Sequence, residues 1–554
     1  MIQKEITQII KKAVKKAQKK GKLPLCQLPP IFLEPPMNRN FGDWTTNFTL
    51  LLGQKIKKNP SLIGSIIIEN IPQNELINKI ECKNGFLNFT LSPFYWQNSL
   101  KRILKEKSSF GNLKIGHGKK IQIEFGSANP TGPLHIAFSR NLYLGDTLAN
   151  ILTKAGYKVW REYYVNNIGK QIEIFARSVE IRYLEILGQK IKFPSDGYQG
   201  EYPILLAKRI INKYGDKFLK EKPLSRLEKF KKLAVGLSIK DAQKTCQKAG
   251  IKFDRWFYES ELYDKNNNIF NKVIKILERK KLIYHHNLAL WFKTTKFKEP
   301  KDDVLIRNDG TPTYFGSDVA YHYEKIALRK FNQVIDIWGA DNSGNVNRLL
   351  KAIEAMGFKN RLSILIYQYV KLLKQGKILD ISKRKGSYIT LDEILQKVGK
   401  DVCRFFLLMR SPNSHLVFDL NLALSQSEKN PVYYVQYAYA RICSILRKVP
   451  KKINLNITSQ KLSLLDHETE LNLIKKLNEL PLLIERIANN YQLIHQLIFY
   501  SLDLANLFHQ FYKNCRVISE DRKLTEARLL LVKASQIVFK ETLKLIGVSA
   551  PSKM

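Results

Sequence analysis

The segment from Glu124 to Asp146 constrains the fold of this chain more than any other part of it. It reads EFGSANPTGPLHIAFSRNLYLGD, so a short β-run enters a turn rich in proline and glycine, passes a histidine and continues into a helix. In parallel α/β sheets, such a turn presents backbone N–H groups and a helix N-terminus to phosphate. Much further along the chain, DISKRKGS from Asp380 to Ser387 can close over the same phosphates as a basic loop. Together the two segments predict a nucleotide-binding α/β domain.

Two apolar runs predict strands of that domain. In KKIQIEFGS, apolar residues alternate with Gln122 and Glu124, as they do on the two faces of a strand. Glu124 then lies at the carboxyl end of its strand, where open α/β sheets bind ligands. A lone glutamate is more often solvated or ion-paired, but its place directly before SANPTG favours a function. A second run, Val334–Trp338, leads through GADNSGN into a helix from about Val346.

These motifs resemble the two signatures of class I aminoacyl-tRNA synthetases, and SANPTGPLH is similar to arginyl-tRNA synthetases in particular. The first signature is usually His-x-Gly-His, whereas this chain has alanine and phenylalanine at its last two positions. The second is usually Lys-Met-Ser-Lys, and here Asp380 and Ile381 precede a retained Ser-Lys-Arg. The resemblance implies a Rossmann-like class I catalytic domain with an N-terminal α+β domain and a C-terminal all-helical anticodon-binding bundle.

The resemblance also implies the residues that handle ATP. The ATP-binding residues would be Gly132, Pro133, His135, Ala137, Phe138, Gly339, Asp341, Ser382 and Lys383. The catalytic residues would be His135, Lys383 and Arg384, with Lys385 able to share the role of the lysine, and Asn342 is a further guess for the adenosine. A lysine near the β- and γ-phosphates neutralises the charge that builds on departing pyrophosphate, and Mg²⁺ is the expected companion of the triphosphate.

The altered first motif leaves two interpretations open. Phe138 cannot donate a hydrogen bond, and the loss of one transition-state donor can cost about 2.7 to 4 kcal/mol. Ala137 adds a methyl group where glycine lets adenine lie close to the backbone. A working arginine–tRNA ligase is the leading interpretation. The alternative is a catalytically impaired paralogue that acts as a tRNA-binding or regulatory protein.

The amino-acid site implied by the resemblance comprises Glu124, Ser127, Asn129, Tyr314 and Asp318. A carboxylate can accept two N–H bonds from a guanidinium, and an amide oxygen can accept one from an ammonium group. Tyr314 and Asp318 are four residues apart, so they share one face if their segment is helical. A site built for a planar guanidinium also predicts that lysine is rejected.

The chain is long enough for several domains, and the resemblance covers all of it. Residues 1–108 are expected to form the N-terminal domain, which in the family binds the outer corner of tRNA at its D-loop. Residues 109–410 would form the catalytic domain, interrupted by a helical insertion at about 185–298, and residues 411–554 the anticodon-binding domain. In this last domain Tyr437, Tyr439 and Arg441 are the candidate tRNA contacts, although each tyrosine alone is more typical of a helical core.

Composition adds weaker expectations. The formal charge of +43 indicates a polyanionic partner, with nucleic acid the leading candidate, although a lysine-rich codon bias accounts for about half of the magnitude. The resemblance implies that this partner is tRNA(Arg). The six cysteines show no CxxC pair, which argues against a structural zinc and for a reducing, cytoplasmic location. No apolar run is long enough to cross a membrane. The lysine-rich N-terminus has the spacing of an amphipathic helix rather than a targeting segment. Because members of the family that the chain resembles are usually monomers, the resemblance implies a monomer.

Overall fold

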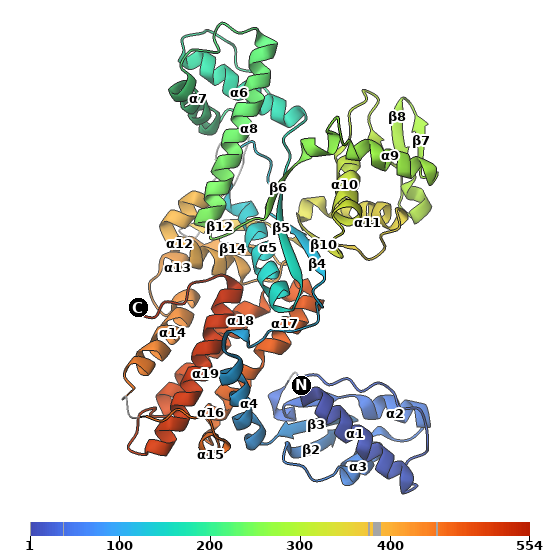
Figure 1. Ribbon diagram of the computed structural model, residues 1–554, viewed down its shortest axis with the longest axis vertical. Coiled ribbons are helices and arrows are strands. Elements are labelled where there is room, and N and C mark those ends of the chain that lie inside the picture. The colour runs from blue at the N-terminus through green and yellow to red at the C-terminus, as the bar shows by residue number, and fades with distance from the viewer. Residues whose placement is uncertain (1, 37, 375–376, 380–388, 450–452) are drawn as a thin grey trace. The chain divides into compact units, whose positions relative to one another are not determined.

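The computed structural model of the chain (Figure 1) describes residues 2–36, 38–374, 377–379, 389–449 and 453–554. These residues fall into two compact units. Unit 1 comprises Met1–Phe110, Ile442–Asn478 and Asn506–Val538, and unit 2 comprises Gly111–Arg441, Glu479–Ala505 and Phe539–Met554. Unit 2 holds most of the residues that the sequence motifs single out, so its sheet is described in more detail.

Five parallel strands form the central sheet of unit 2, in the order β11-β10-β4-β5-β6. Their bounds are β4 (Lys120–Glu124), β5 (Lys158–Val165), β6 (Arg255–Tyr258), β10 (Gln333–Gly339) and β11 (Leu362–Tyr367). The chain builds from β4 outward through β5 to β6, and then places β10 and β11 on the other side of β4. The strand order therefore reverses between β4 and β10, and ligands of open α/β sheets bind at the carboxyl ends of the strands beside such a reversal. The predicted Rossmann-like domain is confirmed.

The alternation predicted along β4 is present, but both faces of the strand are covered. Gln122 is fully buried and Glu124 is 9% exposed. Parallel sheets carry helices on both faces, so polar residues of a central strand become interior residues. Glu124 thus enters the core of the molecule at the edge where the ligand site is expected.

Helix α5 (Ile136–Lys154) follows β4 and packs on β5, β10 and β12 (Val370–Lys374). Its residue Arg140 is fully buried and donates to five backbone carbonyls. The acceptors are the oxygens of Gln368 (3.1 Å), Arg410 (2.7 Å), Ser411 (2.7 Å), Pro412 (3.2 Å) and Ser414 (2.8 Å). Burial lowers the pKa of the Arg140 guanidinium to about 10. This side chain ties α5 to the segments that precede β12 and β14 (Leu416–Asp419).

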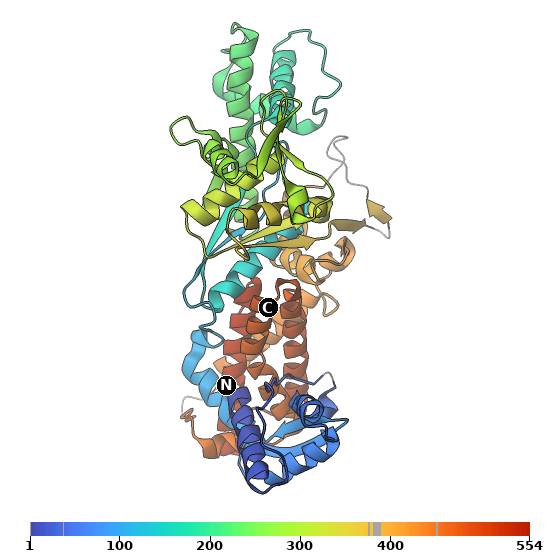
Figure 2. The same ribbon diagram turned by 90° about the vertical axis from the view of Figure 1, so that its right-hand side faces the viewer.

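The predicted helical insertion is helical only in its first part. Helices α6 (Lys170–Ile186), α7 (Glu201–Tyr214) and α8 (Pro223–Lys248) share one apolar core. They lie together as a small helical cluster (Figure 1 and Figure 2). After α8 the chain returns to the central sheet as β6, because the run RWFY favours a strand. Beyond Lys248 the predicted helical insertion contains strands as well as one longer helix, Ile269–Arg279, so the prediction of an all-helical segment is wrong in that part.

The rest of the segment up to β10 forms a mixed lobe. It contains α9 (Ile269–Arg279), a three-stranded sheet of β7 (Ile283–His286), β8 (Ala289–Phe292) and β9 (Asp303–Ile306), and α10 (Tyr314–Tyr323). A π-helical turn, Glu324–Leu328, follows α10 directly. Helix α11 (Val346–Ala355) comes after β10 and begins where the sequence predicted.

A small sheet of β13 (Lys377–Leu379), β12 and β14 stands beside α12 (Leu391–Leu408) and α13 (Leu420–Leu424). From α13 to the end, the described chain is helical, as predicted. The remaining helices are α14 (Pro431–Arg447), α15 (Ser459–Leu462), α16 (Glu468–Asn478), α17 (Leu480–Asn489), α18 (Gln496–Asn514) and α19 (Arg522–Ile546). Among the described helices, none has the length and apolar character that crossing a membrane requires.

In unit 1 the N-terminal segment forms an α+β fold, as predicted. Its elements are α1 (Ile2–Lys19), β1 (Trp44–Thr46), α2 (Phe48–Ile56), α3 (Pro60–Asn70), β2 (Ile77–Lys83), β3 (Phe86–Leu91) and α4 (Pro93–Glu106). The antiparallel sheet has the order β1-β3-β2. Helix α1 buries Ile6, Ile10 and Val14 on one face, which confirms the amphipathic interpretation of the lysine-rich N-terminus.

Candidate active site

The backbone at the end of the first sequence motif is hydrogen-bonded to the residues that directly follow the second motif. The Ile136 N–H donates to the Ile389 carbonyl at 3.2 Å, and the Leu391 N–H donates to the Leu134 carbonyl at 2.8 Å. His135 is 2% exposed and occupies the N-cap of α5 in an extended conformation. This pairing places Ile389 and Leu391, which follow the second motif in the sequence, beside the start of α5. Ser382, Lys383, Arg384 and Lys385 themselves lie outside the described residues.

Phe138 packs among aromatic rings at the first turn of α5. Its ring centroid is 4.4 Å from that of His135 and 4.9 Å from that of Tyr369, and both contacts are edge-to-face. Ala137, the other departure from the usual motif, is buried. Gly132 and Pro133 lie in the turn before them, partly exposed. The altered motif therefore forms an ordered aromatic cluster with Tyr369, which the sequence did not single out.

The second predicted nucleotide contact lies where β10 ends. Gly339 is the last residue of β10, and Asp341 follows in an exposed turn. The Tyr369 hydroxyl hydrogen-bonds the Asp341 carboxylate, and the Asn342 amide donates to the same oxygen at 3.3 Å. A methyl group on Gly339 would collide with the Tyr369 hydroxyl and with Asp341 Oδ1. The two predicted halves of the nucleotide site, on α5 and after β10, are thus joined through Tyr369.

Glu124 lies in a buried network that also contains a lysine. Its Oε2 accepts from Lys325 Nζ at 2.6 Å, and its Oε1 accepts from the Ser127 hydroxyl at 3.0 Å. Lys325 Nζ also lies 3.0 Å from Oδ1 of Asp336, and His322 Nε2 lies 2.6 Å from Oδ2 of Asp336. Burial raises the pKa of Glu124, with Lys325 opposing this effect. Lys325 and His322 together outweigh burial at Asp336 and lower its pKa to about 2.

Lys325 is not among the site residues predicted from sequence, although part of the signal for it is present in the sequence. Glu124 and Asp336 are paired in register on neighbouring strands β4 and β10, so two buried carboxylates stand side by side. Such a pair needs a cation. The π-helical turn after α10 carries Lys325, which is fully buried. A π-turn widens the helix by one residue and is common at functional sites.

Helix α10 places Tyr314 and Asp318 as predicted, one turn apart. The Thr313 side chain caps this helix by accepting from the Gly316 N–H at 3.1 Å. Asp318 is half-buried, and burial raises its pKa well above the ordinary range, as do the negative charges of Glu124, Asp336 and Glu259. Tyr314 is 58% exposed.

Glu259 is a further carboxylate that the sequence analysis missed. It is 5% exposed and follows β6. Burial raises the pKa of Glu259 as well. With its amide nitrogen turned toward this carboxylate, Asn166 donates to Glu259 Oε2 at 3.1 Å. The polar run YESELY predicts that Glu259 is exposed at the surface. Its burial becomes clear only from its position directly after the end of β6. The acids outnumber the cations in this cluster, which suits a positively charged ligand.

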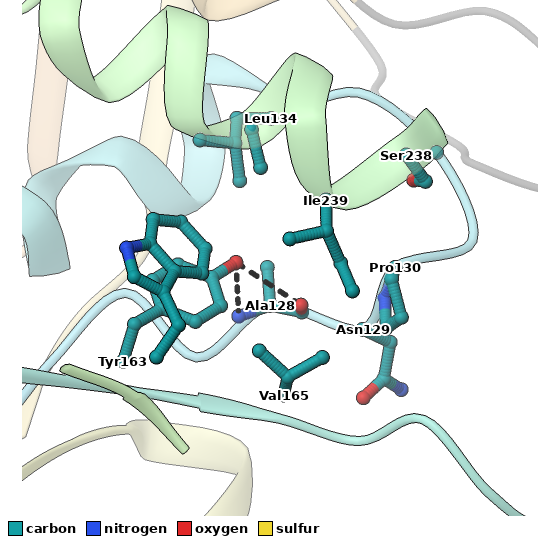
Figure 3. Close-up of a pocket in the computed structure, with 11 residues that line it drawn as sticks. Ala128, Asn129, Pro130, Leu134, Tyr163, Val165, Ser238 and Ile239 are labelled. Carbon is teal, nitrogen blue, oxygen red and sulfur yellow. Dashed lines mark hydrogen bonds between the residues drawn. The ribbon is translucent and has the colours of Figure 1, made fainter. Parts of the chain in front are cut away.

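The turn after β4 bounds a small pocket that opens to solvent. Figure 3 shows Tyr163 beside Ala128, where its hydroxyl accepts from the Ala128 N–H (3.0 Å) and donates to the Ala128 carbonyl (3.1 Å). The Asn129 amide lies at the edge of this pocket and donates to Gln171 Oε1 at 2.8 Å. Asn129 and Gly132 both line the pocket, together with Ile239 of α8. Of the predicted amino-acid residues, Ser127 and Asn129 thus lie in the turn after β4, and Ser127 accepts from the Tyr164 N–H of β5 at 3.1 Å.

The candidate tRNA residues of α14 differ in exposure. Tyr439 is buried, at 5% exposed, so its ring faces the interior of the protein. Tyr437 is 37% exposed, and the Arg441 guanidinium stacks 4.7 Å from its ring centroid. Of the three, Tyr437 and Arg441 remain candidates for contact with a polyanion.

Candidate metal ligands do not gather in the part of the chain that the structure describes. Within those ranges there is no group of three His, Cys, Asp or Glu side chains placed to hold a metal ion. The cysteines are all free thiols, of which Cys246, Cys403, Cys443 and Cys515 are buried.

Comparisons with known proteins agree with the motifs. Family profiles match residues 4–91 (arginyl-tRNA synthetase N-terminal domain), 99–405 (class I tRNA synthetase (R) catalytic domain) and 435–554 (DALR anticodon-binding domain). The arginine–tRNA ligase of Dehalococcoides mccartyi is 42% identical over 557 residues, which cover 99% of this chain and 98% of that protein. That of Carboxydothermus hydrogenoformans is 43% identical over 526 residues, 94% of each chain.

A solved structure extends the likeness to the fold. The arginyl-tRNA synthetase of Thermus thermophilus is 21% identical and superposes with a TM-score of 0.75 over 100% of both chains. On the profile matches and the full-length relatives, this chain belongs to the arginyl-tRNA synthetase family, the class I arginine–tRNA ligases.

Proposed function

We propose that this protein attaches arginine to tRNA(Arg) in two steps. A carboxylate oxygen of arginine attacks the α-phosphorus of ATP, the bond to pyrophosphate breaks, and arginyl-adenylate forms. A terminal hydroxyl of the tRNA then takes the arginyl group and releases AMP. The observation that carries this proposal is the convergence at the strand-order reversal, where the α5 N-terminus, the turn after β10 and a surplus of buried carboxylates meet.

The arginine site is proposed to centre on Asp318. Its carboxyl group has a raised pKa in the empty site because Glu124, Asp336 and Glu259 are close, so a guanidinium cation would relieve this repulsion. Tyr314 is exposed at the start of α10, where its hydroxyl can reach the same cation. Glu259 would complete the set as a third carboxylate.

Glu124 and its neighbours would act on the other side of the arginine. Glu124 is engaged with Lys325 and Ser127, so it would supply negative potential and fix the turn after β4. Asn129 donates its NH₂ end to Gln171, so its oxygen end is oriented as the acceptor for the arginine ammonium.

ATP is proposed to lie across the N-terminus of α5. His135 and the backbone of Gly132 and Pro133 would meet the phosphates, with Ala137 and Phe138 below the nucleoside. Gly339 and Asp341 would meet the adenosine. Ser382, Lys383 and Arg384 would close over the β- and γ-phosphates and stabilise departing pyrophosphate. Mg²⁺ would enter with the triphosphate and neutralise part of its charge, since magnesium usually binds through substrate phosphates and few protein carboxylates.

The remaining assignments follow the domain order. Residues 1–108 would bind the outer corner of tRNA, residues 109–410 would carry catalysis, and residues 411–554 would bind the anticodon through a surface that includes Tyr437 and Arg441. A protein without structural zinc, acting as a monomer in the cytoplasm, completes the proposal. Size-exclusion chromatography with light scattering and a zinc assay of the purified protein test these last points.

Aminoacylation tests the proposed function directly. Purified protein receives ATP, Mg²⁺, tRNA(Arg) and radioactive arginine, and acid-precipitable charged tRNA is measured; lysine in place of arginine should give no product. The D318N variant serves as the matched control, because it keeps the shape of the side chain and removes its charge. If the wild-type protein binds tRNA(Arg) but charges none of it, the aromatic cluster at Phe138 marks an impaired paralogue and the ligase proposal fails.

A further inference from the structure

Tyr369 lies where the two halves of the nucleotide site meet. It sits in the short connection between β11 and β12 and is half-buried. Its ring contacts Phe138 at 4.9 Å and Tyr367 at 5.7 Å between centroids, at interplanar angles of 70° and 82°. Two edge-to-face contacts fix both the position and the tilt of the ring.

The backbone before Tyr369 is also fixed. The Gln368 carbonyl accepts from the buried Arg140 at 3.1 Å, and the Gln368 N–H donates to the Pro412 carbonyl at 2.9 Å. Because Arg140 and Phe138 both belong to α5, this helix holds Tyr369 through its main chain and through its ring. The ring therefore has little freedom relative to the N-terminus of α5.

The hydroxyl of Tyr369 points to the turn after β10. It hydrogen-bonds Oδ1 of Asp341 and passes so close to Gly339 that a Cβ there would touch it. Burial and the neighbouring Asp341 raise the pKa of the Tyr369 hydroxyl, so the group keeps its proton and stays a donor at neutral pH. The side chain of Asp341 is exposed and could adopt several rotamers, and the hydrogen bond from Tyr369 restricts it to those that keep this contact.

We propose that Tyr369 is a positioning residue of the nucleotide site. It holds one oxygen of Asp341 so that the other oxygen faces a ribose hydroxyl of ATP, and Phe138 braces its ring. This inference rests on the proposed function, since it takes ATP as the ligand of the turn after β10. It gives Phe138 a role that a histidine donor would not fill, namely apolar support for Tyr369.

The test is a comparison of Tyr369→Phe with the wild type on ATP and on its 2′-deoxy and 3′-deoxy forms. The variant keeps the ring and loses only the hydroxyl. In aminoacylation with saturating arginine and tRNA, its KM for ATP should rise about tenfold while the KM for arginine stays constant, as expected for one hydrogen bond to a charged group. For one of the two deoxy nucleotides the difference between wild type and variant should vanish, because the hydroxyl that Asp341 binds is then missing.

The chain offers a matched control in Tyr284→Phe. The Tyr284 hydroxyl donates to Asp302 at 3.0 Å, so the same Tyr–Asp bond is removed from the small sheet of β7, β8 and β9. This control should leave the KM for ATP unchanged. A rise in KM that is equal for all three nucleotides would overturn the proposal, as would a Tyr369→Phe variant with wild-type KM values.

Direct binding of ATP, measured by calorimetry without arginine or tRNA, separates this inference from the proposed function. If the wild type charges no tRNA but Tyr369→Phe still binds ATP about tenfold more weakly than the wild type, the ligase proposal fails and the positioning role stands. If the wild type charges tRNA and the two proteins bind ATP equally, the positioning role fails and the ligase proposal stands.

Discussion

Replacing Lys325 with methionine should show how much the buried ion-pair network at β4 and β10 contributes to the stability of unit 2. Lys325 is fully buried, with Nζ 2.6 Å from Glu124 and 3.0 Å from Asp336. The substitution leaves two buried carboxylates beside each other without this cation. Breaking a buried ion pair costs about 3 to 5 kcal/mol, so the free energy of unfolding of unit 2 should fall by about that amount near pH 7.

The pH dependence gives the sign of the effect. In the wild type, Lys325 and His322 lower the pKa of Asp336 to about 2, so this stabilisation is complete above the ordinary pKa of an aspartate and is lost only as pH falls through about 2. In the variant, burial without Lys325 raises the pKa of both carboxyl groups. The folded variant then takes up protons more readily than the unfolded chain, so its deficit should be largest at about pH 8 and smaller at about pH 5.

Hydrogen exchange measured by mass spectrometry during urea titration provides the assay, because peptides from β10 and α10 report on unit 2 alone. The control is Lys351→Met, which removes an exposed partner of Glu354, with Nζ 3.2 Å from its carboxylate. That change should cost about 0.5 kcal/mol or less. A Lys325→Met deficit below about 1 kcal/mol, or one that is the same at both pH values, would refute the reasoning.

Three further substitutions probe other parts of the site. Asp318→Asn should weaken arginine binding about 10- to 100-fold. Because the pKa of Asp318 is raised in the empty site, arginine binding to the wild type should strengthen with rising pH and should release protons. Calorimetry in two buffers detects this proton release, which the variant should not show. Arg140→Met removes five hydrogen bonds to backbone carbonyls, of which those of Ser411 and Pro412 keep a backbone N–H donor, and should lower the stability of unit 2 by about 3 kcal/mol, measured by the same exchange experiment. Gly339→Ala places a methyl group against Tyr369 and Asp341 and should raise the KM for ATP about tenfold, since overpacking costs about 1 to 3 kcal/mol; an unchanged KM would show that the turn relaxes freely.

Local sequence patterns were sufficient for the elements that carry the motifs. The run before Glu124 predicted β4, and GADNSGN predicted the turn into α11. The spacing of Tyr314 and Asp318 predicted a shared face on the condition that their segment is helical, as α10 is. Each of these features depends on neighbours in the chain. Hydrophobic periodicity and turn residues record such short-range preferences well.

Residues whose roles depend on distant contacts escaped prediction. Lys325 reaches Glu124 across 201 residues of sequence and does so from a π-helical turn, which has no simple sequence signal. Glu259 and Tyr369 occupy the ends of β6 and β11, and their place depends on the order of strands in the sheet. The helical insertion was overextended for the same reason, since β6 is a short run that becomes a strand only by pairing with β5. Tertiary pairing overrides local preference in such segments.

The bonds made by Arg140 set a limit on when unit 2 can fold during synthesis. Its acceptors lie 228 to 274 residues further along the chain, from Gln368 to Ser414. A nascent chain that has emerged only as far as β10 carries α5 with a guanidinium that has none of these acceptors, and burying that charge alone is unfavourable. The helices of the insertion can form their own core early, whereas α5 must wait for the turn before β14. Until then its apolar surface is available to chaperones, which makes biogenesis of the catalytic unit a late and concerted event.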